Sequence, residues 1–96
     1  MERYVLIARL KPEGRERARE LLAERGAADY AATDLERHAI FMAEGEVVFF
    51  MEGPDAEQTV RDILNDPVRS TVIGPWLTLF DGPLHVAPEA YFWERG

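Results

Sequence analysis

Four polar side chains have the chemical types that acid–base catalysis requires. A histidine at position 38 or 85 can take up or give back a proton near neutral pH. A tyrosine phenol can donate a hydrogen bond to a substrate oxygen, and an arginine offers a rigid fork of N–H donors to an enolate or carboxylate. The candidate catalytic residues are therefore His38, His85, Tyr30 and Arg9.

Each of these four residues also has a structural interpretation. His38 can be a half-solvated histidine at the end of a strand, and His85 can be an ordinary loop histidine. Tyr30 can pack its ring as a plug, and Arg9 can pair with one of the 18 acidic residues. The sequence leaves these alternatives open, and with them the question of whether the chain is an enzyme.

Large aromatic residues gather in the second half of the chain. Trp76, Phe80 and Tyr91 are candidate ligand-binding residues, because their rings can stack on a flat aromatic molecule. Alternatively, Trp76 and Phe80 belong to the core, since both lie on one helical stripe. Trp93 can instead lie at a subunit interface, where tryptophan is enriched.

Several chemistries are disfavoured by what the sequence lacks. It has no cysteine, one serine outside any nucleophile-elbow motif, no phosphate-binding glycine pattern, and two histidines without metal-ligand spacing. The net charge of −7 disfavours nucleic acids and anionic membranes as partners. The longest late apolar run, 47–51, is far too short to span a membrane. We therefore expect a cytoplasmic protein with no metal and no cofactor.

The elements that must position these residues follow from hydrophobic patterning. Period-two or continuous apolar runs predict strands, and 3.6-residue stripes predict helices. Asp55 and Gln58 have capping-box spacing at the start of the second helix, and Gly26 suits the end of the first. The expected strands are 1–10, 37–43, 46–52 and 90–93, and the expected helices are 15–25, 55–64 and a kinked stretch over 68–80.

This order predicts an α+β fold with the ferredoxin-like βαββαβ plan in a single domain, 1–96. Right-handed crossovers place the helices on one face of a four-stranded antiparallel sheet. The strands, however, are apolar on both faces, and 47% of the chain is apolar. Because monomers rarely expose such a face, we expect a homodimer with two sheets packed face to face.

The strand Tyr4-Val5-Leu6-Ile7-Ala8-Arg9-Leu10, the hairpin around Gly45 and the terminal Ala90-Tyr91-Phe92-Trp93 resemble the dimeric α/β-barrel superfamily. The stretch 37–93 is most similar to small aromatic-polyketide cyclases of the tetracenomycin type. The superfamily includes cofactor-free monooxygenases, polyketide cyclases, haem-degrading enzymes, sugar mutarotases and proteins without known activity.

The resemblance implies a homodimeric α/β barrel with an apolar ligand cleft between the helices and the sheet of each subunit. It implies a cofactor-free, cyclase-like or monooxygenase-like enzyme acting on an aromatic or ketone substrate. Haem-binding members carry an axial histidine in the second helical region, and 55–80 contains none, so haem is disfavoured. The alternative is a non-catalytic small-molecule-binding or dimerisation module.

Overall fold

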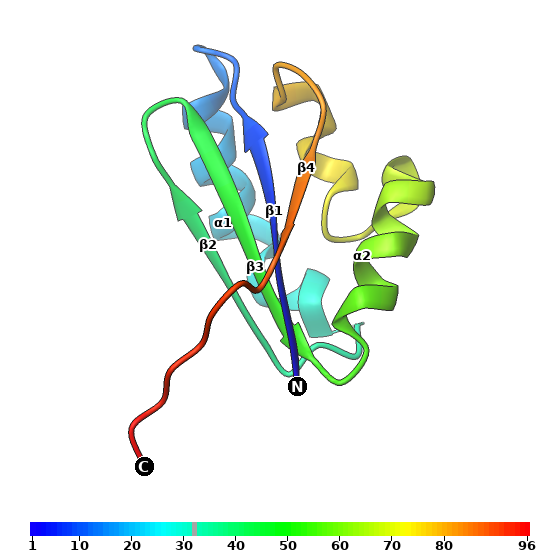
Figure 1. The fold of residues 1–96 in the computed structure, drawn as a ribbon. Helices are drawn as coiled ribbons and strands as arrows, with labels where there is room; N and C mark the ends of the chain where they lie inside the picture. The colour runs from blue at the N-terminus through cyan, green and yellow to red at the C-terminus, as the bar shows by residue number, and fades with distance from the viewer. Residues whose placement is uncertain (32) are drawn as a thin grey trace.

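A four-stranded sheet with helices on one of its faces forms the computed structural model of this chain (Figure 1). The structure describes the backbone of residues 1–31 and 33–96 and the side chains of 1–24 and 33–96. Two short 3-10 helices, η1 (Pro67–Arg69) and η2 (Gly74–Leu79), follow the second α-helix. The other elements are β1 (Glu2–Arg9), α1 (Gly14–Ala31), β2 (Arg37–Met42), β3 (Glu46–Gly53), α2 (Ala56–Asn65) and β4 (His85–Pro88).

The strand order in the sheet is β2-β3-β1-β4, and every neighbouring pair is antiparallel. The predicted strand–helix–strand–strand–helix–strand order is thus confirmed, and so is the four-stranded antiparallel sheet. Both long strands lie at the centre, where β1 pairs with β3 along its whole length, from Glu2 opposite Gly53 to Arg9 opposite Glu46.

One face of the sheet packs against the helices and carries the core. Leu6 and Ala8 of β1 and Phe49 of β3 are fully buried on this face. The ring of Trp76 from η2 meets the ring of Phe49 edge to face, with centroids 5.0 Å apart. Phe80 makes a similar contact with Phe49 at 6.3 Å. The helical layer is therefore fixed to the sheet by aromatic packing around one central side chain.

None of the described helices packs against the other face of the sheet, called here the open face (Figure 1). Its apolar side chains alternate with the core residues along each strand, as the register requires. Phe41 is 61% exposed on this face. On β1, β2 and β3, the apolar side chains of the open face are Val5, Ile7, Ala39, Phe41, Val48 and Phe50.

The last strand differs from the prediction. Residues 90–93 form no strand, and β4 lies earlier, where it pairs with β1 from Tyr4 opposite Pro88 to Ile7 opposite His85. A proline is tolerated there because β4 is an edge strand, in which one side of the backbone needs no partner. The prediction of a strand over 90–93 is therefore wrong.

The two α-helices differ from the prediction, α1 at its end and α2 at its start. Helix α1 continues past Gly26 to Ala31. Asp55 precedes α2 but makes no side-chain capping bond, so the predicted capping box is wrong. The carboxylate of Glu2 instead accepts a hydrogen bond from the N–H of Glu57 at 2.9 Å, which satisfies one free donor of the first turn.

The expected kinked helix over 68–80 is divided into η1 and η2. The two short helices approach closely at Gly74, where an added Cβ would lie 2.8 Å from the carbonyl oxygen of Val68. Pro75, at the start of η2, lacks the N–H that a continuous helix would use. In the described part of the chain, no helix combines the length and the apolar character that crossing a membrane requires.

Candidate functional site

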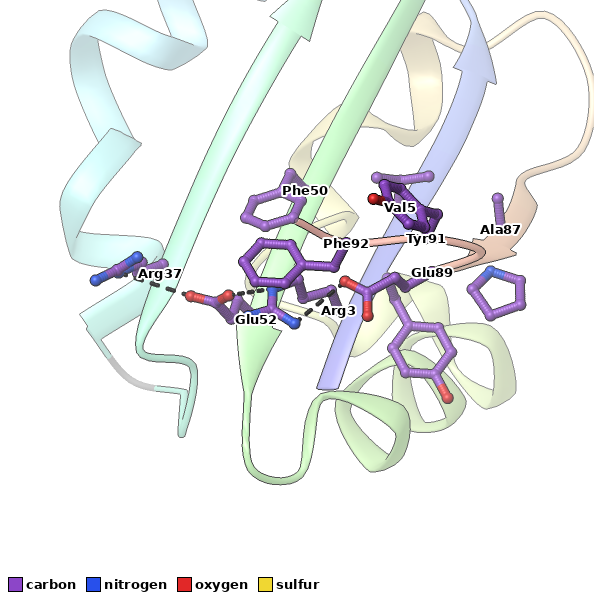
Figure 2. A pocket seen from close by; sticks show the side chains of 11 residues that line it. Arg3, Val5, Arg37, Phe50, Glu52, Ala87, Glu89, Tyr91 and Phe92 are labelled. Atoms are coloured by element: carbon purple, nitrogen blue, oxygen red, sulfur yellow. Dashed lines mark hydrogen bonds and ion pairs between the residues drawn. The ribbon is translucent and has the colours of Figure 1, made fainter. Parts of the chain in front are cut away.

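A cavity of about 380 Å³ lies on the open face, at the end of the sheet where β1 begins. Strands β1, β3 and β4 supply its floor, and the chain after β4 supplies one wall (Figure 2). Most of its lining is apolar, with charged groups at one end. The side chains that define it are Arg3, Val5, Phe50, Glu52, Tyr91 and Phe92, with Arg37, Ala87 and Glu89 around them.

Four charged side chains form a network at this end of the cavity. The Nε of Arg3 lies 2.5 Å from Oε2 of Glu52, and its NH1 lies 3.2 Å from Oε2 of Glu89. The Nε of Arg37 lies 3.6 Å from Oε1 of Glu52 (Figure 2). Glu52 is the buried charged residue of the described chain, and burying a carboxylate is costly unless cations lie beside it.

The strand register explains this clustering. Arg3 and Arg37 stand directly opposite Glu52 on the two strands that flank β3. Opposed residues of antiparallel strands project to the same face, with their Cβ atoms about 5 Å apart. At the other end of β1, Arg9 stands opposite Glu46 in the same way. The apolar middle of the open face therefore lies between two charged ends.

The C-terminal arm, residues 89–96, borders the cavity and then leaves the sheet (Figure 1). Its first backbone N–H, that of Glu89, donates to the carbonyl of Arg3 at 3.1 Å. The ring of Phe92 lies over the guanidinium of Arg3, with 3.5 Å between Cζ and the ring centroid. Tyr91 and Trp93 are exposed. Arg3 thus holds the arm through a carboxylate and an aromatic ring.

The two candidate histidines lie on opposite faces of the sheet. His38 stands opposite the core residue Met51, whereas His85 stands opposite Ile7 of the open face. Desolvation by the surrounding protein lowers the pKa of His38 below 6.5, which favours the neutral imidazole at neutral pH. The structure therefore does not bring the two histidines together.

The other two candidate catalytic residues are also separate. Arg9 is exposed on the open face, at the end of β1 away from the cavity. Residue 30 lies within α1, beyond the end at 25 that the sequence predicts for this helix, and the side chain of Tyr30 falls outside the part of the chain that the structure describes.

The three candidate ligand-binding aromatics occupy two environments. Trp76 and Phe80 are buried in the core around Phe49. Tyr91 lines the open-face cavity. Tyr4 also borders this cavity, and desolvation, followed by the charges of Glu57 and Glu2, raises the pKa of its phenol. The Tyr4 phenol is therefore neutral over the physiological range, and its hydrogen bond with the Glu57 side chain also raises this pKa.

A second cavity, also of about 380 Å³, lies on the helical side of the sheet. Helix α2 and the segment after it form one side, and the chain that follows α1 forms the other. Its lining is about half polar and includes Asp62, Asp66, Arg69 and Ser70. The hydroxyl of Ser70 is already used, since it accepts from the N–H groups of Val72 and Ile73 at 3.1 Å. Among the described side chains, no group of three or more metal-ligating residues is arranged around a common point.

Sequence reasoning did not select Arg3, Glu52 or Glu89. The sequence contains a pattern that could have identified them, because β1 and β3 each carry an apolar run with a charged residue on either side. The residues on either side of the run are arginines in β1 and glutamates in β3. Antiparallel pairing of these two runs predicts charge pairs at both ends of the sheet.

No family model matches this chain, and no curated protein matches it. Its fold is similar to two solved structures. The structure of Rv0793 from Mycobacterium tuberculosis is 17% identical, with a TM-score of 0.63 over 99% of this chain and 98% of that one. The structure of Atu4242 from Agrobacterium tumefaciens is 18% identical, with a TM-score of 0.62 over 96% of each chain. At this level of identity the likeness concerns the fold alone.

Proposed function

We propose that this chain is one subunit of a homodimeric, ferredoxin-like α/β barrel that binds a small aromatic molecule. The observation that carries the dimer is the apolar open face, where Phe41 on the edge strand β2 is 61% exposed. A second copy related by a two-fold axis covers such a face with an identical one. This packing removes Phe41, Val48 and Ile7 from water in both subunits.

The charge distribution on the open face supports this arrangement. Interfaces usually have an apolar centre and a polar rim. Here the apolar side chains of Ile7, Phe41 and Val48 lie between two charged ends, with the ion pair Arg3–Glu52 at one end and Arg9 opposite Glu46 at the other. The open-face cavity then lies at the rim of the interface, accessible to a ligand.

The composition of this cavity supports ligand binding as the function. Small-molecule sites are mostly apolar, with a few polar groups that fix the orientation of the ligand. Phe50 on the floor offers aromatic surface, and Arg3 offers a cation paired with Glu52. None of the described candidate acid–base residues lines this cavity. We therefore favour a binding role over catalysis there.

Sedimentation equilibrium at micromolar concentration tests the dimer. The wild type should have about twice the 10.9 kDa mass of the chain. Phe41→Glu should be a monomer, because it places a charge on the apolar face that the second copy would cover. Val68→Glu is the matched control, because Val68 is 75% exposed on η1, away from the sheet, and its change should leave the dimer intact. A monomeric wild type would contradict the proposal.

A second candidate, a cofactor-free enzyme acting on a ketone, is favoured by one observation. The lowered pKa of His38 keeps its imidazole neutral, as a general base for an α-proton must be. Deuterium incorporation into the methyl group of acetophenone, followed by NMR, tests this candidate. Acceleration by the wild type but not by His38→Gln would support catalysis, and equal rates with both proteins would exclude His38 as the base.

A further inference from the structure

Two chemically different groups of the C-terminal arm contact the same guanidinium. Glu89 places a carboxylate oxygen 3.2 Å from NH1 of Arg3, and Phe92 places its ring 3.5 Å from Cζ. An arginine binds a small aromatic acid through these same two contacts, a charged hydrogen bond and a cation–π contact. The arm therefore presents to Arg3 the two parts of such a molecule.

We infer that the open-face cavity binds a small aromatic carboxylate, and that Glu89 and Phe92 take its place when no ligand is bound. This inference rests on the proposed ligand-binding function and specifies its ligand class. With the arm in place the cavity already measures about 380 Å³, which is within the usual range for small-molecule sites. Its apolar walls, Val5, Phe50 and Ala87, suit the ring of the ligand.

Arg3 is organised in advance for this contact. Glu52 holds its Nε at 2.5 Å, and Glu52 is itself buried between β1 and β2. The guanidinium therefore loses little conformational entropy when a ligand replaces the arm. Its NH1 and one of its faces are the parts that the arm contacts, and they become available together when the arm moves.

The charge balance predicts a preference for anions. With the arm in place, the positive charges of Arg3 and Arg37 are matched by the negative charges of Glu52 and Glu89. When Glu89 leaves with the arm, the remaining three groups carry a net positive charge. A carboxylate ligand restores neutrality, whereas an uncharged ligand of the same shape leaves Arg3 without its second anion.

In the described part of the chain, the hydrogen bonds, the ion pair and the ring contact that join the arm to the sheet all involve Arg3. Residues 90–96 belong to no helix or strand, and both Tyr91 and Trp93 are exposed. A tethered group competes with a free ligand at an effective concentration in the millimolar range. Removing the competing group should therefore tighten ligand binding, an effect that a merely structural contact would not produce.

The experiment titrates the full chain with 1-naphthoate and with the uncharged 1-naphthalenemethanol, and follows the amide NMR signals of Val5 and Ala87. The proteins are the wild type, Arg3→Met, Phe92→Ala and Glu89→Gln. Arg69→Met is the matched control, because Arg69 is an exposed arginine on η1 that pairs with Asp66. Circular dichroism verifies that each variant is folded.

We expect wild-type protein to bind 1-naphthoate more tightly than the alcohol by about tenfold or more. Phe92→Ala and Glu89→Gln should each tighten naphthoate binding by about threefold or more. Arg3→Met should abolish the preference for the acid, and Arg69→Met should keep it.

Equal affinity for the acid and the alcohol would overturn the carboxylate inference while leaving ligand binding in this cavity supported. Weaker or unchanged naphthoate binding by Phe92→Ala would overturn the role given to the arm. Unfolding would not explain such a result, because residue 92 is exposed. If neither molecule shifts the amides of the cavity, both the inference and the proposed ligand-binding function fail.

Discussion

The Arg3–Glu52 pair should stabilise the fold far more than an exposed pair of the same length. In the pair Arg61–Glu57 on α2, the nitrogen and oxygen are also 2.5 Å apart. The side chains of Arg3 and Glu52 are 18% and 8% exposed, against 64% and 44% for Arg61 and Glu57. The two pairs therefore differ in burial and not in distance.

Burial determines how large a coupling free energy we expect for each pair. At 2.5 Å, two unit charges attract by about 1.7 kcal/mol in water and by about 6.6 kcal/mol at an effective dielectric constant of 20. Loss of hydration offsets most of the larger value. We therefore expect a coupling free energy of about 2 kcal/mol for the ion pair Arg3–Glu52, at the low end of the range measured for close, desolvated charge pairs. The exposed pair should give about 0.5 kcal/mol or less.

Double-mutant cycles measured by urea unfolding test this expectation. The first cycle uses Arg3→Met, Glu52→Gln and the double variant, and the second uses Arg61→Met, Glu57→Gln and their double variant. All proteins are compared at one fixed subunit concentration, because a dimer's apparent stability depends on concentration. A coupling below about 0.5 kcal/mol for Arg3–Glu52 would refute the claim that its burial strengthens the pair.

Three further predictions concern the core, the close approach of η1 to η2, and pH. Trp76→Ala should lower the free energy of unfolding by roughly 3–5 kcal/mol in urea, because it opens a cavity beside Phe49; a loss below about 1 kcal/mol would contradict this packing. Gly74→Ala should lower the melting temperature through a cost of about 1–3 kcal/mol, whereas Gly45→Ala, where an added Cβ meets nothing within 4 Å, should change little. The lowered pKa of His38 means that the unfolded chain takes up the proton more readily, so the stability of the wild type relative to His38→Gln should fall as the pH drops through 6.5 and below. Equal pH profiles for the two proteins in urea titrations would show that His38 is not desolvated.

The apolar pattern of the chain was sufficient to predict the central sheet. Leu6 and Ala8 alternate with Val5 and Ile7, and the structure separates these two sets onto the core face and the open face. The pattern failed at β4, because any apolar stretch near the C-terminus can pair with the edge of β1. Which stretch does so depends on the length of the connection after η2, and sequence patterning does not measure that length.

The candidate site was harder to predict than the fold. His38 and His85 are chemically versatile, but their positions on opposite faces follow from the register of two different strand pairs. Arg3 and Glu52 are 49 positions apart in sequence and become neighbours only through the pairing of β1 with β3. Residue type alone therefore favoured the histidines, whereas strand register created the charged network.

The packing of two open faces is tested most directly by isotope-filtered NOE spectroscopy on a mixture of labelled and unlabelled chains. This experiment detects only contacts between different copies. We predict intermolecular NOEs that involve Ile7, Phe41 and Val48, and none that involve Val68 on the helical side. Intermolecular NOEs confined to the helical layer, or none at all at millimolar concentration, would contradict the proposed dimer.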